Sequence, residues 1–186
     1  MTRTLYQTIL GADFDQVPPE IRRMHSFARV ATGSADVTRG RSAVAGLICY
    51  LARLPEARKG VAVETHFAPI EGGERWTRVF GKQPFQTDMM VGKRDNFPCM
   101  EERLGPFLFK MRVIATPDGI DLTPEKVYLG PLSIPLWLSP KAIGRERVKN
   151  GKYSFFVEVT FPIVGKVFGY AGWLEPSVLL DETEKT

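Results

Sequence analysis

The stretch Gly73-Glu74-Arg75-Trp76-Thr77-Arg78-Val79-Phe80-Gly81 indicates the fold most directly. Side chains on a β-strand alternate between two faces, so one face of this predicted strand carries Glu74, Trp76, Arg78 and Phe80. A strand face that combines two aromatic rings with a carboxylate and a guanidinium is unusual. It predicts either a core face that contains an ion pair or the wall of a pocket, and the sequence leaves both readings open.

The period of two continues on both sides of this stretch. It predicts further strands, joined by glycine- and proline-containing turns, over 61–67, 84–91, 99–104, 107–115 and 120–129. Gly130–Pro140 is apolar and rich in proline, and we expect a packed loop there. After a turn at Phe161–Gly165, a last strand is predicted over Lys166–Leu174.

Asn150-Gly151 is the strongest hairpin signal in the chain. A two-residue turn there pairs Lys149 with Lys152 and places Glu146 opposite Phe155. In this register Glu146 lies on an apolar face, where a carboxylate is costly unless it is paired. We expect its partner to be an arginine, either Arg78 or Arg39. The pair is either a structural ion pair or part of a cavity that binds a polar ligand group.

Helical patterns precede the strands. Apolar spacing predicts a helix near Leu5–Leu10, a second from Pro18 to about Phe27, and a third from Ser42 to Leu54. The third has a broad apolar stripe, so we expect it to cover a sheet or to plug the end of a barrel. Between the second and third helices, Val30–Thr38 is interpreted as an extended link or a short strand.

Helices followed by a run of strands predict an α+β fold. We expect one domain over 1–186, with a helical part at 1–60, an antiparallel meander of about eight strands at 61–176, and an acidic tail at 177–186. The sheet is expected to curl into a barrel or half-barrel. A helix-grip fold is the main rival, but such folds end in a long helix, whereas this chain ends in a predicted strand and a polar tail.

Composition narrows the functional classes. The net charge is +4 and the pI is about 9.1, yet basic and acidic residues are mixed throughout, which does not favour a nucleic-acid partner. Cys49 and Cys99 are expected to be two buried or semi-buried thiols. Two distant histidines, His25 and His66, make a weak metal site, and no cofactor is expected. Without a signal peptide or a spanning apolar run, we expect a soluble cytoplasmic protein.

Six short patterns follow one another along the chain: Leu5-Tyr6…Leu10-Gly11, Pro18-Pro19…Arg22…His25, Thr38-Arg39-Gly40, Glu74-x-Trp76-x-Arg78-x-Phe80, Glu101-Glu102-x-x-Gly105-Pro106 and Tyr170-x-Gly172-Trp173-Leu174. In this order they resemble a bacterial domain of unknown function that occurs alone or fused behind saccharopine-dehydrogenase-like domains. The likeness runs from about Leu5 to Pro176 and departs at Ser133 and Trp137, where a second Pro-Leu-Pro pattern is expected. The resemblance implies no activity, and the fusion implies only small-molecule metabolism.

The leading functional hypothesis is a module that binds an apolar or amphipathic small molecule inside the curled sheet. The predicted ligand-binding residues are Arg39, Glu74, Trp76, Arg78, Phe80, Glu146, Phe155 and Tyr170. One alternative is an enzyme that uses a Glu/Arg pair in the same cavity, and another is a structural or interaction domain without a cavity. The Glu101-Glu102 pair is not expected to form an acid/base dyad, because neighbouring strand residues point to opposite faces.

Overall fold

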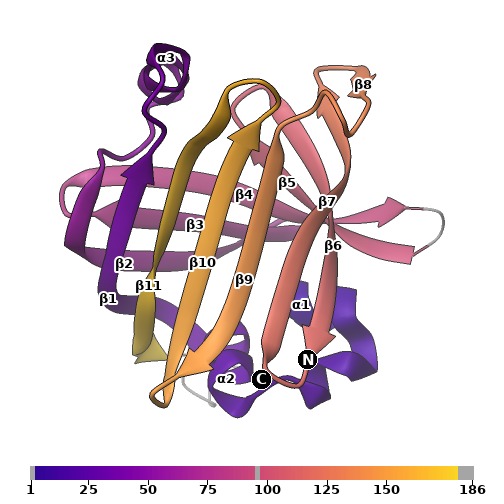
Figure 1. Cartoon of the computed structure of the whole chain (residues 1–186). Coiled ribbons are helices and arrows are strands. Elements are labelled where there is room, and N and C mark those ends of the chain that lie inside the picture. Colours follow the sequence, from indigo (N-terminus) through magenta and orange to yellow (C-terminus); the bar gives the residue numbers. More distant parts are fainter. Residues whose placement is uncertain (1–2, 95–96, 180–186) are drawn as a thin grey trace.

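A computed structural model describes residues 3–94 and 97–179 of the chain. Ten antiparallel strands form a closed barrel in the order β6-β5-β4-β3-β2-β1-β11-β10-β9-β7, and pairing of β6 with β7 closes it (Figure 1). The strands are β1 (Ala28–Arg39), β2 (Arg58–Ile70), β3 (Gly73–Phe80), β4 (Gln83–Arg94), β5 (Phe97–Leu104), β6 (Phe107–Thr116), β7 (Gly119–Leu129), β9 (Lys141–Lys149), β10 (Lys152–Phe161) and β11 (Gly165–Leu179). A short strand, β8 (Leu132–Ile134), pairs with β7 outside this circuit.

The predicted N-terminal helices and curled antiparallel sheet are therefore confirmed. Of the two expected forms, barrel and half-barrel, the structure has the barrel, and it has ten strands where about eight were expected. The clearest difference is β1, predicted as a link or a short strand. It is twelve residues long and pairs with both β2 and β11. Its small residues give a weak strand pattern, but they permit close approach: a Cβ on Gly33 would lie 2.0 Å from the carbonyl oxygen of Trp173.

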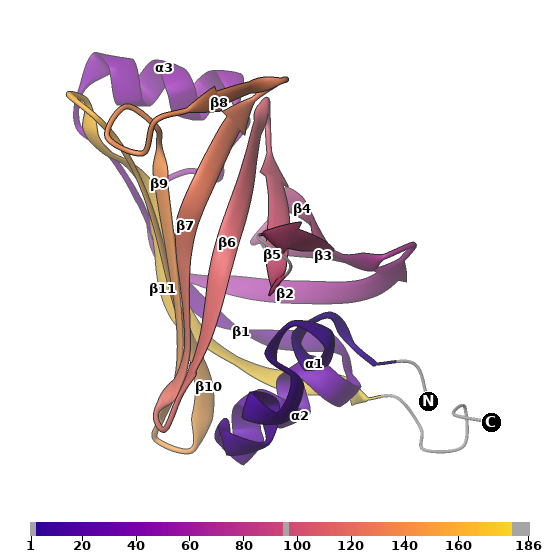
Figure 2. The ribbon, with the colours of Figure 1, turned by 90° about the vertical axis from the view of Figure 1, so that its right-hand side faces the viewer.

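The helices at the N-terminus close one end of the barrel (Figure 2). They are α1 (Leu5–Leu10), a 3₁₀ helix η1 (Gly11–Gln16) and α2 (Pro19–Phe27). The Gln7 side chain caps the start of α1 by accepting a 3.0 Å hydrogen bond from the Thr4 amide, and Pro19 opens α2 at the position where a missing N–H costs nothing. Their buried side chains include Leu5, Tyr6, Ile9, Phe14, Ile21 and Met24.

The predicted third helix is present as α3 (Ala43–Leu51), and the Ser42 side chain caps it by accepting a hydrogen bond from the Ala45 amide. Its predicted packing is wrong. Only its small side chains, Ala45 and Cys49, are buried, whereas Leu47 is 57% exposed and Leu51 is 71% exposed. The helix stands on the rim of the barrel against β1 and β11, so its apolar stripe neither covers the sheet nor plugs the opening.

The expected packed loop at 130–140 is also wrong in its packing. The segment contains β8 and then turns, and its large apolar side chains Leu132, Leu136, Trp137 and Leu138 are all exposed. A run of apolar residues shows that a segment can bury surface, but it does not show that the rest of the chain covers it.

The hairpin register is confirmed. Lys149 pairs with Lys152 and Glu146 pairs with Phe155. Asn150 and Gly151 both have positive φ angles, 52° and 71°, as a two-residue turn of the type that matches strand twist requires. Cys49 and Cys99 are buried and are not joined by a disulfide. In the part of the chain that is described, no helix is long and apolar enough to cross a bilayer.

Candidate functional site

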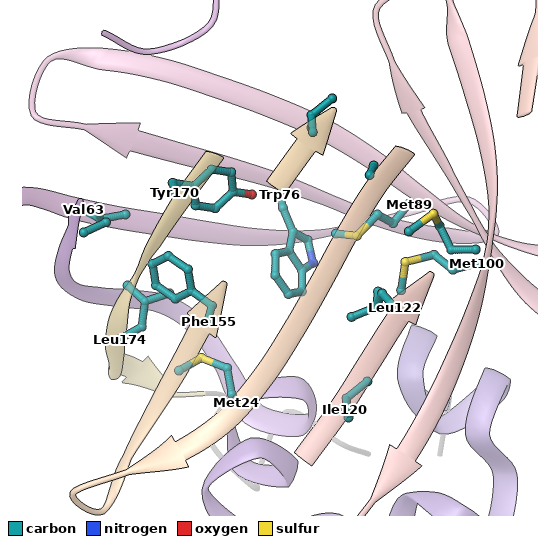
Figure 3. Packing of buried hydrophobic residues seen from close by; sticks show 14 of the residues in the cluster. Met24, Val63, Trp76, Met89, Met100, Ile120, Leu122, Phe155, Tyr170 and Leu174 are labelled. Atoms are coloured by element: carbon teal, nitrogen blue, oxygen red, sulfur yellow. The ribbon is translucent and has the colours of Figure 1, made fainter. Parts of the chain in front are cut away.

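The barrel encloses a cavity of about 80 Å³, enough for several water molecules or part of a small ligand. The strand face predicted from the sequence forms one wall, because Trp76, Arg78 and Phe80 on β3 all line it. Phe155 on β10 and Tyr170 on β11 line the opposite side, and Figure 3 shows both rings pointing into the same interior as Trp76.

Aromatic and sulfur-containing side chains make up a large part of the cavity lining. The rings of Phe80 and Tyr170 meet edge to face with centroids 5.2 Å apart, and Phe155 lies 5.8 Å from Tyr170. Met89 and Met111 also line the cavity, together with aliphatic side chains such as Val63 and Leu122. Aromatic and methionine side chains adapt well to a small apolar group, so this part of the cavity suits a hydrocarbon or ring moiety.

Arg78 brings a permanent positive charge to the cavity. Its guanidinium carbon lies 4.8 Å from the centroid of the Trp76 ring, which is a cation–π geometry, and Nη1 donates a 3.0 Å hydrogen bond to the Thr87 hydroxyl. The positive charge of Arg78 also opposes the rise in the pKa values of Glu102 and Tyr170. Arg78 is thus fixed at the junction between the aromatic wall and a polar corner.

Glu102 on β5 is the acid of that corner. Burial raises the pKa of Glu102 above its ordinary value, although the Arg78 charge and a hydrogen bond with Thr87 both act to lower it. A carboxyl with a raised pKa keeps its proton to higher pH. Arg78 and Glu102 therefore give the cavity a fixed cation and a neighbouring group able to carry a proton.

Glu146 on β9 is the centre of a second polar group. It is 5% exposed; Oε2 lies 2.6 Å from Nε2 of His25 on α2, and Oε1 accepts a 3.0 Å hydrogen bond from the Tyr6 hydroxyl on α1. Tyr153 is also hydrogen-bonded to this carboxyl. Burial, followed by the negative charge of Glu146, raises the pKa values of Tyr6 and Tyr153 well above the ordinary tyrosine value.

The aromatic rings around Glu146 are stacked. Tyr6 lies on the imidazole of His25 with centroids 3.7 Å apart, and Trp76 lies 5.7 Å from the same imidazole. Glu74 holds this stack at the barrel end: Oε2 accepts from the indole nitrogen of Trp76, and Oε1 accepts from the amide of Leu5, both at 3.0 Å. The N-terminal helices α1, η1 and α2, which together we call the helical plug, are therefore joined to the cavity wall by hydrogen bonds as well as by apolar contact.

The structure brings six of the predicted residues into the cavity wall: Trp76, Arg78, Phe80, Glu146, Phe155 and Tyr170. Glu74 does not line the cavity, and its carboxylate accepts a hydrogen bond from the Trp76 indole. Arg39 is outside the cavity, where its guanidinium donates to the carbonyl oxygens of Leu54 and Pro55 after α3.

Glu146 is buried and paired, as predicted, but the expected arginine partner is wrong. The observed partners, His25 and Tyr6, lie on helices 121 and 140 residues away along the chain. His25, named from the sequence only as one of two histidines in a weak metal site, is buried and lies against the Glu146 carboxylate. The predicted ligand-binding residues also did not include Tyr6, Thr87, Glu102 and Tyr153. Alternation along β5 was the only available signal for Glu102, because it places this residue on the same face as the buried Met100.

Within residues 3–94 and 97–179, no cluster of three or more His, Cys, Asp and Glu side chains has the arrangement of a metal site. The fold and the cavity define a closed antiparallel β-barrel with helices over one end and a mixed polar and aromatic interior. The chain belongs to the family described as Domain of unknown function (DUF4166), whose model matches residues 17–174. Neither a curated protein nor a solved structure shows a significant match.

Proposed function

We propose that this domain binds a small amphipathic molecule with an acidic head inside the barrel. The observation that carries the proposal is the guanidinium of Arg78 in the wall of a cavity that is otherwise mainly aromatic and apolar. A carboxylate or similar group on the ligand would pair with Arg78, and its hydrocarbon part would contact Phe80, Phe155 and Met89. Glu102, while protonated, would donate a further hydrogen bond to a ligand oxygen.

The preorganisation of Arg78 supports this assignment. Thr87 and the Trp76 ring hold the guanidinium in place before any ligand arrives, so little side-chain entropy is lost on binding. The low polarity of the surrounding wall strengthens a charge-assisted hydrogen bond relative to the same bond in water.

A matched pair of probes tests the proposal: octanoate, which has an acidic head, and octanol, which has the same chain without a charge. Binding is followed by the fluorescence of Trp76 in a Trp137→Phe/Trp173→Phe background. Arg78→Met keeps most of the side-chain volume, so the fold survives. It should weaken octanoate by roughly ten- to a hundredfold, since a charge-assisted hydrogen bond contributes about 1.5–3 kcal/mol, and leave octanol unchanged. Equal weakening of both probes, or no binding of either, would contradict the proposal.

A second candidate is an enzyme of small-molecule metabolism that uses the same cavity. The observation that favours it is that two carboxyl groups line the same cavity: Glu146, which contacts a buried histidine, and Glu102, which has a raised pKa and lies near Arg78. A ligand identified by the binding assay would be incubated with the protein and followed by NMR. New ligand resonances that disappear with Glu102→Gln support the enzyme, whereas an unchanged ligand supports a binding module. If neither probe binds, the remaining hypothesis is a structural or interaction domain without a ligand.

A further inference from the structure

One end of the barrel carries an unusual concentration of exposed apolar side chains. Three elements meet there, opposite the helical plug: α3, the β10–β11 turn, and the β8 segment (Figures 1 and 2). Their exposed large apolar residues are Val44, Leu47, Tyr50, Leu51, Leu132, Leu136, Trp137, Leu138 and Ile163. We call this set the apolar rim.

The large apolar side chains of the rim point away from the barrel core rather than into it. The helix α3 contains no charged residue between Ala43 and Leu51, yet only Ala45 and Cys49 are fully buried, and Ile48 packs partly against the core. Tyr50 is 78% exposed and Trp137 is 76% exposed. Isolated exposed apolar residues are ordinary, but a group of large ones on neighbouring projections marks a surface that binds something apolar.

The charged residues around the apolar rim indicate which kind of partner this surface binds. The segments 40–55, 130–141 and 161–167 contain no Asp or Glu, although the chain has 21 of these residues. They contain Arg41, Arg53, Lys141 and Lys166, of which Lys166 pairs with Glu158 on β10. A second copy of the chain would bring the same cations face to face, which disfavours a symmetric dimer through this end.

We propose that the apolar rim is a peripheral docking surface for an anionic lipid bilayer. The projecting side chains of α3, the β8 segment and the β10–β11 turn enter the boundary between headgroups and acyl chains, with Trp137 and Tyr50 at the interfacial level that aromatic residues favour. Arg41, Arg53 and Lys141 then contact lipid phosphates. This is attachment to one face of a membrane and requires no spanning segment. It is independent of the ligand proposed for the cavity.

Vesicle cosedimentation tests the proposal with two lipid compositions: phosphatidylcholine alone, and phosphatidylcholine with about one-third phosphatidylglycerol. The full chain should bind the anionic vesicles, bind the neutral ones at least tenfold more weakly, and dissociate as salt rises from about 0.05 M to about 0.5 M. Tryptophan emission should shift to shorter wavelength on binding, because Trp137 leaves water.

Two pairs of variants locate the contact. Trp137→Ser should weaken binding about tenfold or more, whereas Phe97→Ser, at a residue on β5 that is equally exposed at 74%, should not. Arg41→Glu/Arg53→Glu should abolish binding to anionic vesicles. The control Arg23→Glu/Lys149→Glu changes the net charge by the same amount, but these two residues lie at the opposite end of the barrel. This control variant should therefore retain most of the binding to anionic vesicles. Circular dichroism verifies that each variant is folded. If a variant does not fold, the dependence of wild-type binding on lipid composition and salt still tests the proposal.

Several outcomes would overturn the proposal. Absence of binding to anionic vesicles, equal binding to neutral ones, or equal losses in the two members of either variant pair would do so. A dimer that Leu47→Asp dissociates, with no vesicle binding by wild type, would instead assign the rim to a second copy of the chain. A monomer that binds neither vesicles nor itself would assign it to a protein partner.

Discussion

The buried contact between Glu146 and His25 makes a sharp prediction, because the chain contains its own control. Glu64 and His66 form the same type of contact at the same distance, 2.6 Å, but their side chains are 52% and 46% exposed. The two Glu–His contacts share chemistry and distance, but the Glu146 contact is buried and its carboxyl also binds Tyr6. We expect Glu146→Ala to destabilise the fold strongly and Glu64→Ala to change its stability very little.

The magnitude follows from what each substitution leaves behind. Removal of the Glu146 carboxyl leaves Tyr6, His25 and Tyr153 buried without their hydrogen-bond partner. Removing the shared acceptor from such a buried hydrogen-bonded network lowers the free energy of unfolding by about 3–5 kcal/mol. An exposed pair such as Glu64–His66 contributes below about 1 kcal/mol, because water replaces the missing partner.

Glu146→Gln should fall between the two, at about 1–2 kcal/mol. The amide oxygen can still accept from Tyr6. The amide nitrogen needs an acceptor, and His25 can provide one at Nε2 if its hydrogen moves to Nδ1, which is buried and has no hydrogen-bond partner among the described residues. This exchange of tautomer limits the loss to part of the network.

Urea denaturation of the three variants and wild type, followed by circular dichroism at about pH 7, gives the changes in unfolding free energy if the m-values agree. The expected order of destabilisation is Glu146→Ala, then Glu146→Gln, then Glu64→Ala. Equal small losses for Glu146→Ala and Glu64→Ala would refute the reasoning, since they would show that water reaches the Glu146 site as readily as the surface.

Two further substitutions test the polar corner of the cavity and the anchor of α3. Burial raises the pKa of Glu102 in the folded state above its value in the unfolded chain. At a pH between these two pKa values, the folded protein keeps a proton on Glu102 that the unfolded chain has released. The free energy of unfolding therefore falls as pH rises through this range. Glu102→Gln should therefore melt above wild type near pH 7, with the difference disappearing near pH 4; a constant difference would contradict the assignment. Arg39→Met removes two hydrogen bonds to the chain after α3 and should cost about 1–2 kcal/mol and accelerate proteolysis within 41–55. Octanoate affinity should stay unchanged, and its loss would make Arg39 a ligand residue.

The features that the sequence determined are local. A period of two fixes which side chains share a strand face, and this was sufficient to place Trp76, Arg78 and Phe80 together in one wall. Asn150-Gly151 fixes a two-residue turn, and the turn fixes the register that buries Glu146. Both inferences depend only on backbone geometry within a few residues, which no distant contact alters.

The features that only the tertiary structure decided are the partners across the chain. Alternation shows that Glu146 needs a buried partner, but closure of the barrel and docking of α1 and α2 bring His25 and Tyr6 to it. In the same way, the stripe of α3 shows that an apolar face exists and does not show what covers it. Burial is a property of the assembled surface. For α3 that surface leaves Leu47 and Leu51 in solvent, because the barrel beneath the helix contacts only Ala45 and Cys49 closely enough to bury them.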